Sequence, residues 1–171
     1  MWTGYREHSK EEIQELITKY PWLENRATAE HNVTWLDDLE PGWYEAFGKE
    51  LCEELAEAIE EDGSNEFEII QIKEKFGALR FYAAGYGLKT RDVIAKYEEL
   101  SKYVCGHCGK PAKYITTGWI YPLCEYCIEE INGHYAEIWD FYNFANMEEV
   151  DSEVEKIKTN YIYSDYWKPV K

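Results

Sequence analysis

The sequence predicts an α+β fold in which helices pack on a small antiparallel β-sheet or hairpin, with a zinc ribbon or treble-clef-like module near the centre. Apolar residues recur at helical spacing in several segments, residues 66–84 alternate as a β-hairpin does, and two CxxC pairs follow. With 171 residues, 45% of them hydrophobic, the chain can bury one core. We therefore expect a single domain over residues 1–171, with a zinc module embedded at 103–131.

Two helices are predicted before the hairpin. Ser9 and Glu12 form a capping-box pattern, and the helical spacing that follows stops at Pro21. Residues 22–40 show no clear periodicity, so we expect a loop that packs through its aromatic side chains. Pro41 then begins a stronger helix, which Gly63 follows. Its apolar face is formed by residues at helical spacing: Trp43, Phe47, Leu51, Leu55 and Ile59.

The opposite face of this second helix is strongly acidic. Seven glutamates lie on it: Glu45, Glu50, Glu53, Glu54, Glu57, Glu60 and Glu61. An ordinary solvated helix face is one interpretation. The other is an acidic surface that imitates a phosphate backbone and binds a protein, with Glu53, Glu57 and Glu61 as the candidate partner-binding residues.

Residues 66–84 are predicted to form a hairpin around a two-residue type II′ turn at Gly77-Ala78, because glycine suits the first central position. In that register one surface carries three facing pairs: Lys75 with Arg80, Lys73 with Tyr82, and Gln71 with Ala84. The other surface carries Glu74 and the apolar side chains, namely Ile70, Ile72, Phe76, Leu79, Phe81 and Ala83.

The cations of this hairpin contrast with the rest of the chain. The formal net charge is -16, yet residues 64–122 contain nine basic and six acidic side chains. A lysine opposite an arginine needs a neutralising partner, either a carboxylate from the acidic helices or a phosphate or carboxylate ligand. For a ligand, the candidate residues are Lys73, Lys75, Arg80 and Tyr82. Tyr86 and Trp119 are candidates to stack on a base.

Helical spacing returns after the hairpin. It predicts a helix over residues 90–103, which leads into the first cysteine pair, and an aromatic-rich helix over residues 128–142 beyond the second pair. A last helix is expected at 147–158.

Four cysteines predict a structural zinc site: Cys105, Cys108, Cys124 and Cys127. Two residues between thiolates let one turn present both sulfurs to one ion, and Gly109 suits such a tight turn. Four thiolates fill a tetrahedral zinc, so we expect His107 and His134 to lie outside the coordination sphere. Cys52 is expected to be a buried thiol beside the apolar stripe of the second helix.

Several functional classes are disfavoured. The sequence has no Gly-rich phosphate loop, nucleophile elbow or HExxH motif, so we expect no catalysis and assign no catalytic residue. No stretch approaches the roughly 18 apolar residues of a membrane span, and no leader pattern is evident, so a cytoplasmic protein is expected. The acidic outer segments would repel anionic membranes and nucleic acid, so direct nucleic-acid binding is not expected either.

Three segments resemble an uncharacterised family of small bacterial and bacteriophage proteins: PGW at 41–43, QIKEKFGALRFY at 71–82, and the CxxC…CxxC pattern. This resemblance covers about half of the chain and implies a phage or prophage setting and a zinc-bearing fold. Residues 103–131 also look like the zinc finger of the DksA/TraR transcription factors, in which helices flank a four-cysteine site.

The leading expectation is a non-catalytic, zinc-stabilised acidic binding protein. Encoded by a phage and acting in the host cytoplasm, it would inhibit a bacterial host or defence protein by direct contact, through nucleic-acid mimicry. One alternative is sequestration of a nucleotide or other anionic signal by the hairpin cations. Another is transcriptional regulation through the zinc finger.

Overall fold

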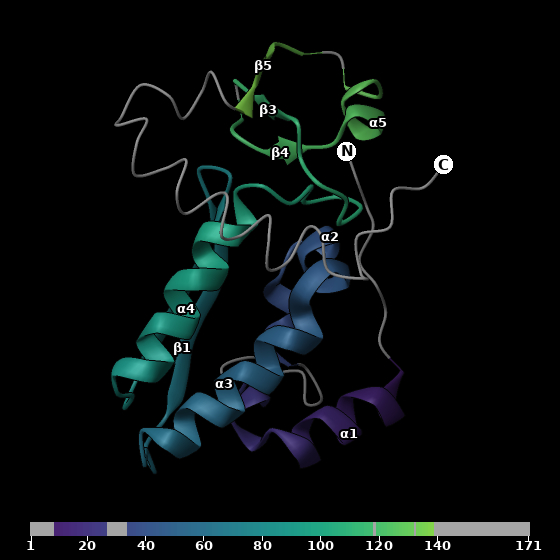
Figure 1. Cartoon of the computed structure of the whole chain (residues 1–171). Coiled ribbons are helices and arrows are strands. Elements are labelled where there is room, and N and C mark those ends of the chain that lie inside the picture. The colour runs from purple at the N-terminus through teal and green to yellow at the C-terminus, as the bar shows by residue number, and fades with distance from the viewer. Residues whose placement is uncertain (1–8, 27–33, 118, 132, 139–171) are drawn as a thin grey trace.

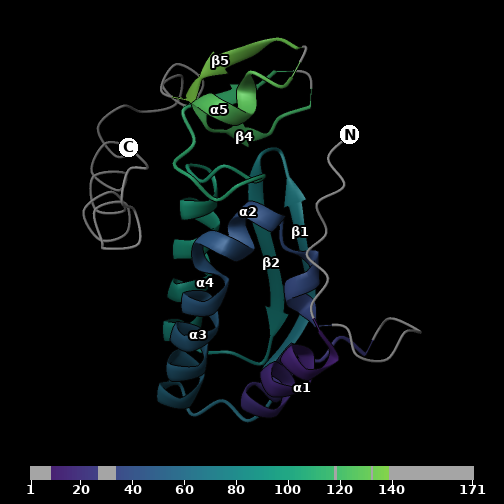
Figure 2. The same cartoon turned by 90° about the vertical axis from the view of Figure 1, so that its right-hand side faces the viewer.

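Residues 9–26, 34–117, 119–131 and 133–138 are described in a computed structural model of the chain (Figure 1). Helices and a two-stranded hairpin form a larger body, and a three-stranded sheet near the cysteines lies at one end of it (Figures 1 and 2). The α+β prediction is therefore confirmed. The helix predicted at 147–158 lies outside the described residues.

The first helix, α1 (Lys10–Lys19), begins at the predicted capping box. The backbone N–H of Glu12 donates to Ser9 Oγ at 3.1 Å, and the backbone N–H of Ser9 donates to the Glu12 carboxylate at 2.9 Å. The expected loop that follows contains two short 3₁₀ helices, η1 (Pro21–Leu23) and η2 (Trp35–Asp38). Both pack beside the first strand of the hairpin.

The helix predicted from Pro41 is continuous in three parts: α2 (Pro41–Trp43), a π-helical turn η3 (Tyr44–Gly48) and α3 (Lys49–Glu61). Its apolar stripe forms the core together with α4 (Leu88–Ser101), as the ring centroids of Phe47 and Tyr97 lie 5.3 Å apart. The buried Tyr97 hydroxyl donates to Glu54 at 2.9 Å, so its polar group is satisfied. The prediction of a helix at 90–103 is thus confirmed, with both of its ends two residues earlier.

The end of α3 caps the start of α4. The carboxylate of Asp62 accepts backbone hydrogen bonds from Thr90 at 2.9 Å and from Lys89 and Gly87 at 3.1 Å each. These bonds, that from Thr90 first, hold the pKa of Asp62 below its ordinary value. One carboxylate therefore joins the end of α3 to the start of α4, at the open end of the hairpin that separates these two helices in the sequence.

The hairpin pairs β1 (Glu68–Lys75) with β2 (Ala78–Ala84), but the predicted turn is wrong by one residue. Phe76 and Gly77 occupy the turn with φ of 54° and 77°, the signs of a type I′ turn, whose twist matches that of the strands. The facing pairs on the polar surface are therefore Lys75 with Ala78, Lys73 with Arg80, and Gln71 with Tyr82. That surface keeps the predicted cations, because each partner moved by two positions.

The predicted apolar surface needs two corrections. The register shifts between Ile69 and Gln71, so Ile69 faces the core at 3% exposure while Ile70 is 58% exposed. Phe76 is 68% exposed because it belongs to the turn rather than to the strand. Glu74, the expected polar member, accepts a hydrogen bond from the Gly77 backbone N–H at 2.7 Å.

Helix α4 also satisfies the outer edge of β2. The backbone N–H of Leu79 donates to Ser101 Oγ, and that of Phe81 donates to the Glu98 carboxylate, both at 2.8 Å. Unpaired N–H groups on an edge strand otherwise invite pairing with another chain. This edge is therefore covered from within the fold.

A second sheet has the strand order β4-β3-β5, with β3 (Tyr114–Thr116), β4 (Pro122–Leu123) and β5 (Tyr135–Glu137). A four-residue helix, α5 (Glu125–Ile128), follows β4. The helix predicted over 128–142 is wrong in its described part, because 135–137 pair with the edge of β3. Residues 139–142 lie outside the described part. The sheet thus extends past residue 131, where the module was expected to end.

Among the helices described here, none combines the length and the apolar character that crossing a bilayer would require.

Candidate metal centre and neighbouring surfaces

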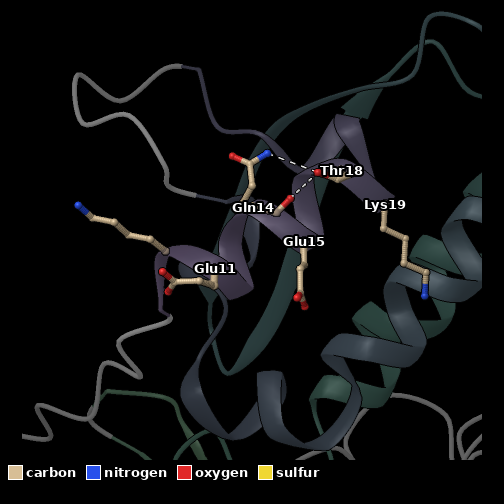
Figure 3. A pocket seen from close by; sticks show the side chains of 6 residues that line it. Glu11, Gln14, Glu15, Thr18 and Lys19 are labelled. Atoms are coloured by element: carbon tan, nitrogen blue, oxygen red, sulfur yellow. Dashed lines mark hydrogen bonds between the residues drawn. The ribbon is translucent and has the colours of Figure 1, made fainter.

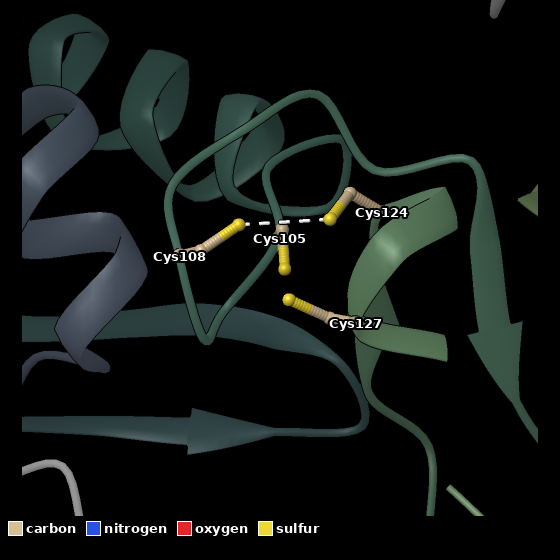
Figure 4. Close-up of side chains that lie close together, drawn as sticks. All are labelled: Cys105, Cys108, Cys124 and Cys127. Carbon is tan, nitrogen blue, oxygen red and sulfur yellow. Dashed lines mark hydrogen bonds between the residues drawn. The ribbon is translucent and has the colours of Figure 1, made fainter. Parts of the chain in front are cut away.

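The four predicted cysteines come together in space (Figure 4). All four Sγ atoms lie within 4.8 Å of one another, and those of Cys108 and Cys124 are 3.6 Å apart. A tetrahedral zinc with Zn–S bonds of 2.3 Å would separate the sulfurs by about 3.8 Å. The cluster could therefore hold a metal ion, and its four sulfur donors are those of a structural zinc site. Neither His107 nor His134 belongs to this cluster of described residues.

A tight turn positions the first cysteine pair. The backbone N–H of Cys105 donates to Lys110 O at 2.8 Å, and that of Gly109 donates to Cys105 O at 2.9 Å. Gly109 has a φ of 77°, the left-handed conformation for which glycine was expected here. The chain thus folds back on itself so that Cys105 and Cys108 face one point.

The second pair lies at the start of α5. Cys124 is the residue before the helix and Cys127 is in its first turn, with Ile128 N–H donating to Cys124 O at 3.1 Å. The strands β3 and β4 join this helix to the first turn. A cysteine turn, a hairpin and a helix that begins at the second pair occur in the order of a treble-clef module, one of the two module types expected from the sequence.

The thiols differ in acidity. Burial raises the pKa of Cys108 to about 11. Burial acts in the same direction on Cys124, but hydrogen bonds from the Cys127 backbone and from the Cys108 thiol bring its pKa below the ordinary value. Because thiolates rather than thiols bind metals, occupation of the site by a metal ion would release protons.

The PGW segment contacts the first cysteine turn backbone to backbone. The N–H of Gly42 donates to Gly106 O at 2.7 Å, and a Cβ atom on Gly42 would lie 2.1 Å from Cys105 O. Only glycine fits at such a distance. The next residue, Trp43, is fully buried and donates from Nε1 to Val104 O at 3.1 Å. We call this contact the α2 seam (residues 41–43 against 104–109).

A half-buried hydrogen bond lies beside the α2 seam. The hydroxyl of Tyr121 donates to the Glu40 carboxylate at 2.5 Å. Burial raises the pKa of Glu40, the hydrogen bond from Tyr121 opposes that shift, and the charge of Glu74 adds to it. Burial also raises the pKa of Tyr121. This pair therefore links the residue before α2 to the loop that precedes β4.

The tip of the hairpin rests on the same module. A Cβ on Gly77 would lie 3.0 Å from Ile120 Cγ2 and 3.4 Å from Ile115 Cδ1. The sequence patterns predict neither this contact nor the α2 seam. The glycine between Pro41 and Trp43 could have indicated a close backbone contact, but the same pattern is equally typical of the start of a helix.

The hairpin cations have no acidic partner in the described part of the chain. Lys73 Nζ lies 5.3 Å from the ring centroid of Tyr82, Lys75 Nζ lies 5.5 Å from that of Phe76, and Arg80 donates to the backbone oxygen of Leu79 at 3.0 Å. None of the three forms an ion pair with a described residue. The internal-carboxylate interpretation thus finds no support among these residues.

The basic residues of α4 and its C-terminal cap behave differently. Each of them has an acidic neighbour: Lys89 pairs with Glu61, Arg91 with Asp92, Lys96 with Glu54, and Lys102 with Glu99. Ion pairs are therefore common among the described cations of this third of the sequence, whereas the hairpin cations, like Lys110 beside Tyr126, form none with a described residue.

The acidic face of α3 is partly neutralised. Glu53 lies 3.9 Å from Lys49, and Glu61 is the partner of Lys89. Glu57 is exposed and forms no ion pair with any residue in the described ranges. Of the predicted partner-binding residues, two thus have an internal cation close by.

Three further features are neither metal ligands nor members of the hairpin or acidic surfaces: a buried thiol, two exposed aromatic side chains and a depression on α1. The thiol is that of Cys52, whose pKa burial raises to about 12, so it remains protonated. Tyr86 and Trp119 are exposed rather than in the core, at 41% and 77%. A surface depression on α1 (Figure 3) contains none of the predicted site residues; its described lining is Lys10, Glu11, Gln14, Glu15, Thr18 and Lys19.

The fold and the cysteine cluster define a small α+β protein with four clustered cysteines that could hold a metal ion. Comparisons of the chain with protein-family models, with curated proteins and with solved structures found no match. The functional inference therefore rests on the geometry.

Proposed function

We propose that this chain is a non-catalytic, zinc-stabilised binding protein whose hairpin face binds an anionic ligand. The hairpin face is defined as Lys73, Lys75, Arg80 and Tyr82. One observation carries the proposal: in an acid-rich protein where the cations of α4 are paired, the hairpin cations have no acidic partner among the described residues.

The metal has a structural role in this proposal. Four thiolates would complete a tetrahedral zinc and leave no open position for a substrate or water. The first cysteine turn also forms one side of the α2 seam, so the metal would hold together residues that the helical body packs against. Loss of zinc should consequently affect folding rather than chemistry.

The electrostatics of the hairpin face favour an anion. Lys73 and Arg80 are directly opposite each other, and like charges in that position destabilise a strand pair by about 0.2–1 kcal/mol. A phosphate or carboxylate between them would remove this repulsion, and the guanidinium of Arg80 can bind such a group with two hydrogen bonds. Bound anion should therefore stabilise the folded protein.

The test is thermal unfolding in sodium tripolyphosphate against sodium chloride at equal ionic strength, with the free zinc concentration held equal because tripolyphosphate also binds divalent metals. We expect tripolyphosphate to raise the unfolding temperature of the native chain but not that of a Lys73→Ala/Arg80→Ala variant. The matched control is Arg91→Ala/Lys96→Ala, which removes the same charge from α4 and should keep the response. An equal response of the native chain and the hairpin variant would contradict the proposal.

A second candidate function uses the acidic face of α3. The supporting observation is that Glu57 is exposed without an ion pair to a described residue, while the Glu53–Lys49 contact joins two exposed side chains and contributes little. Such a face would bind a basic site on a bacterial host or defence protein in place of nucleic acid, which fits a phage-encoded inhibitor acting in the host cytoplasm. Its test is salt-sensitive capture of one host protein that charge reversal at Glu53, Glu57 and Glu61 abolishes.

Transcriptional regulation through the zinc finger is not favoured. The resemblance to the DksA/TraR finger implies helices on both sides of the cysteines, whereas the described chain has α4 on one side and only the four-residue α5 on the other. Residues 135–137 form β5 instead.

A further inference from the structure

The hairpin presents exposed aromatic rings beside its cations. Tyr82 is 43% exposed and lies next to Lys73, and Phe76 is 68% exposed and lies next to Lys75. Each aromatic ring therefore has an ammonium group at 5.3–5.5 Å from its centre. The two chemistries that a nucleotide offers, an anionic phosphate and a flat base, both have counterparts on this surface.

Phe76 is a costly residue for its position. Its φ of 54° is unfavourable for a bulky side chain, and type I′ turns strongly prefer asparagine, aspartate or glycine there. Burial does not offset this cost, since most of the ring is exposed. A strained, exposed aromatic residue at a hairpin tip is accounted for if the ring contacts a ligand.

The shape of the surface favours an extended ligand. Lys73 and Lys75 are alternate residues of one strand, which places them about 6.8 Å apart along the sheet, with Arg80 opposite Lys73. On this face Lys75 and Tyr82 are exposed, while Lys73 and Arg80 are half-buried. Mononucleotides are usually bound in concave pockets, whereas single strands are bound along surfaces that combine cations with stacking aromatics.

We infer that the ligand of the hairpin face is a short stretch of single-stranded nucleic acid. Its phosphates contact Lys73, Lys75 and Arg80, and its bases stack on Tyr82 and Phe76. This inference rests on the proposed function of the same face, and it departs from the charge-based expectation of no nucleic-acid binding because the face lies in the net-positive residues 64–122. A single strand fits better than a duplex, because paired bases offer no free face to Tyr82 and because a duplex brings many phosphates towards a chain of net charge -16.

The test is fluorescence anisotropy with labelled dodecamers of thymidylate and of uridylate, at low and at physiological salt. The variants are compared on the dodecamer that the native protein binds more tightly. We expect Lys73→Ala/Arg80→Ala to weaken binding of that dodecamer at least tenfold. Tyr82→Ala should weaken it about five- to hundredfold, the range for loss of one stacked base, while Tyr82→Phe should bind normally. The preference between the two oligomers distinguishes DNA from RNA.

A matched control comes from the zinc module, where Lys110 Nζ lies 4.6 Å from the ring centroid of exposed Tyr126. Tyr126→Ala removes an equivalent ring beside an equivalent cation and should leave oligomer binding unchanged. Far-UV circular dichroism and zinc content establish that each variant is folded.

Three results would overturn the inference. If tripolyphosphate stabilises the protein through Lys73 and Arg80 but Tyr82→Ala binds the oligomers normally, the face binds anions without reading bases, and the proposed function stands alone. If a duplex of equal length binds as tightly as the single strands, the ligand is not single-stranded. If neither tripolyphosphate nor an oligomer binds, both the inference and the proposed function fail.

Discussion

The α2 seam and the hairpin face differ in how their polar groups are used. At the seam, the N–H of Gly42 and the indole of Trp43 each donate to a backbone oxygen of residues 104–109, and no space remains for one more carbon atom. On the hairpin face, three cations have no acidic partner among the described residues. This difference distinguishes residues that the fold needs from residues whose charge no described acidic side chain neutralises. Four predictions test it, from the largest expected effect to the smallest.

Removal of the metal should have the largest effect. Structural zinc contributes about 10 kcal/mol or more in small zinc modules, as much as the whole stability of a typical domain. We expect chelation, or Cys127→Ser, to abolish zinc binding and lower the unfolding temperature sharply, as measured by metal analysis and thermal unfolding. Cys52→Ala is the control: it should lose about 1 kcal/mol and keep its zinc. Full stability after complete chelation would disprove a structural metal.

Gly42→Ala should have the next largest effect. The added Cβ would lie 2.1 Å from Cys105 O, so the α2 seam must open. We expect a loss of about 3 kcal/mol or more in urea unfolding, at the upper end for overpacking. Gly48→Ala in the same helix is the matched control, because its Cβ would meet only the Tyr44 side chain, at 3.3 Å and beyond. Similar stabilities for the two variants would show that the seam adapts easily.

Tyr121→Phe should have a smaller, pH-dependent effect. Burial raises the pKa of Glu40 in the folded protein above its ordinary value. The stability of the fold therefore falls as the pH rises from the ordinary carboxyl pKa to the raised one, because the carboxylate must ionise where it is half-buried. The hydrogen bond from the Tyr121 hydroxyl reduces this loss. Without this donor, we expect a loss of about 1 kcal/mol at pH 8 and a smaller loss at pH 5. Tyr126→Phe, an exposed control, should change neither value. A loss that grows towards acid would reverse the sign and reject this explanation.

Neutralising the hairpin face should have the smallest effect. We expect Lys73→Ala and Arg80→Ala to change the free energy of unfolding by no more than about 0.5 kcal/mol, towards greater stability because a like-charge pair is relieved. Lys96→Ala, which breaks the half-buried pair with Glu54, should lose about 1 kcal/mol. If Lys73→Ala or Arg80→Ala is as destabilising as Lys96→Ala, the fold itself uses the hairpin cations.

Features encoded within a few residues were predicted well from the sequence. The capping box at Ser9, the helix that begins at Pro41 and the cysteine spacing all depend on local geometry, and the structure confirms them. The left-handed Gly109 belongs to the same group. Such features follow from the few conformations that short peptide segments can adopt.

Features decided by distant contacts were not predictable in the same way. Gly77 was correctly placed in the turn, but its contact with Ile120 lies outside any local rule, and the choice between two adjacent turn positions was wrong. Tyr135 and Ile138 fit a helical repeat, yet Tyr135 pairs with Thr116 in a sheet, since the open edge of β3 provides hydrogen bonds that a helix would otherwise make internally. Gly42 shows its role only when the cysteine turn is placed against it.

The contact between the hairpin tip and the segment between the two cysteine pairs has a thermodynamic consequence. Gly77 packs on Ile115 and Ile120, which belong to the segment between the two cysteine pairs, and Phe76 is its direct neighbour. Metal occupancy and the position of the tip therefore share one set of contacts. A ligand that binds the tip more tightly in the metal-loaded protein must, by reciprocity, raise the affinity of the protein for the metal by the same coupling free energy.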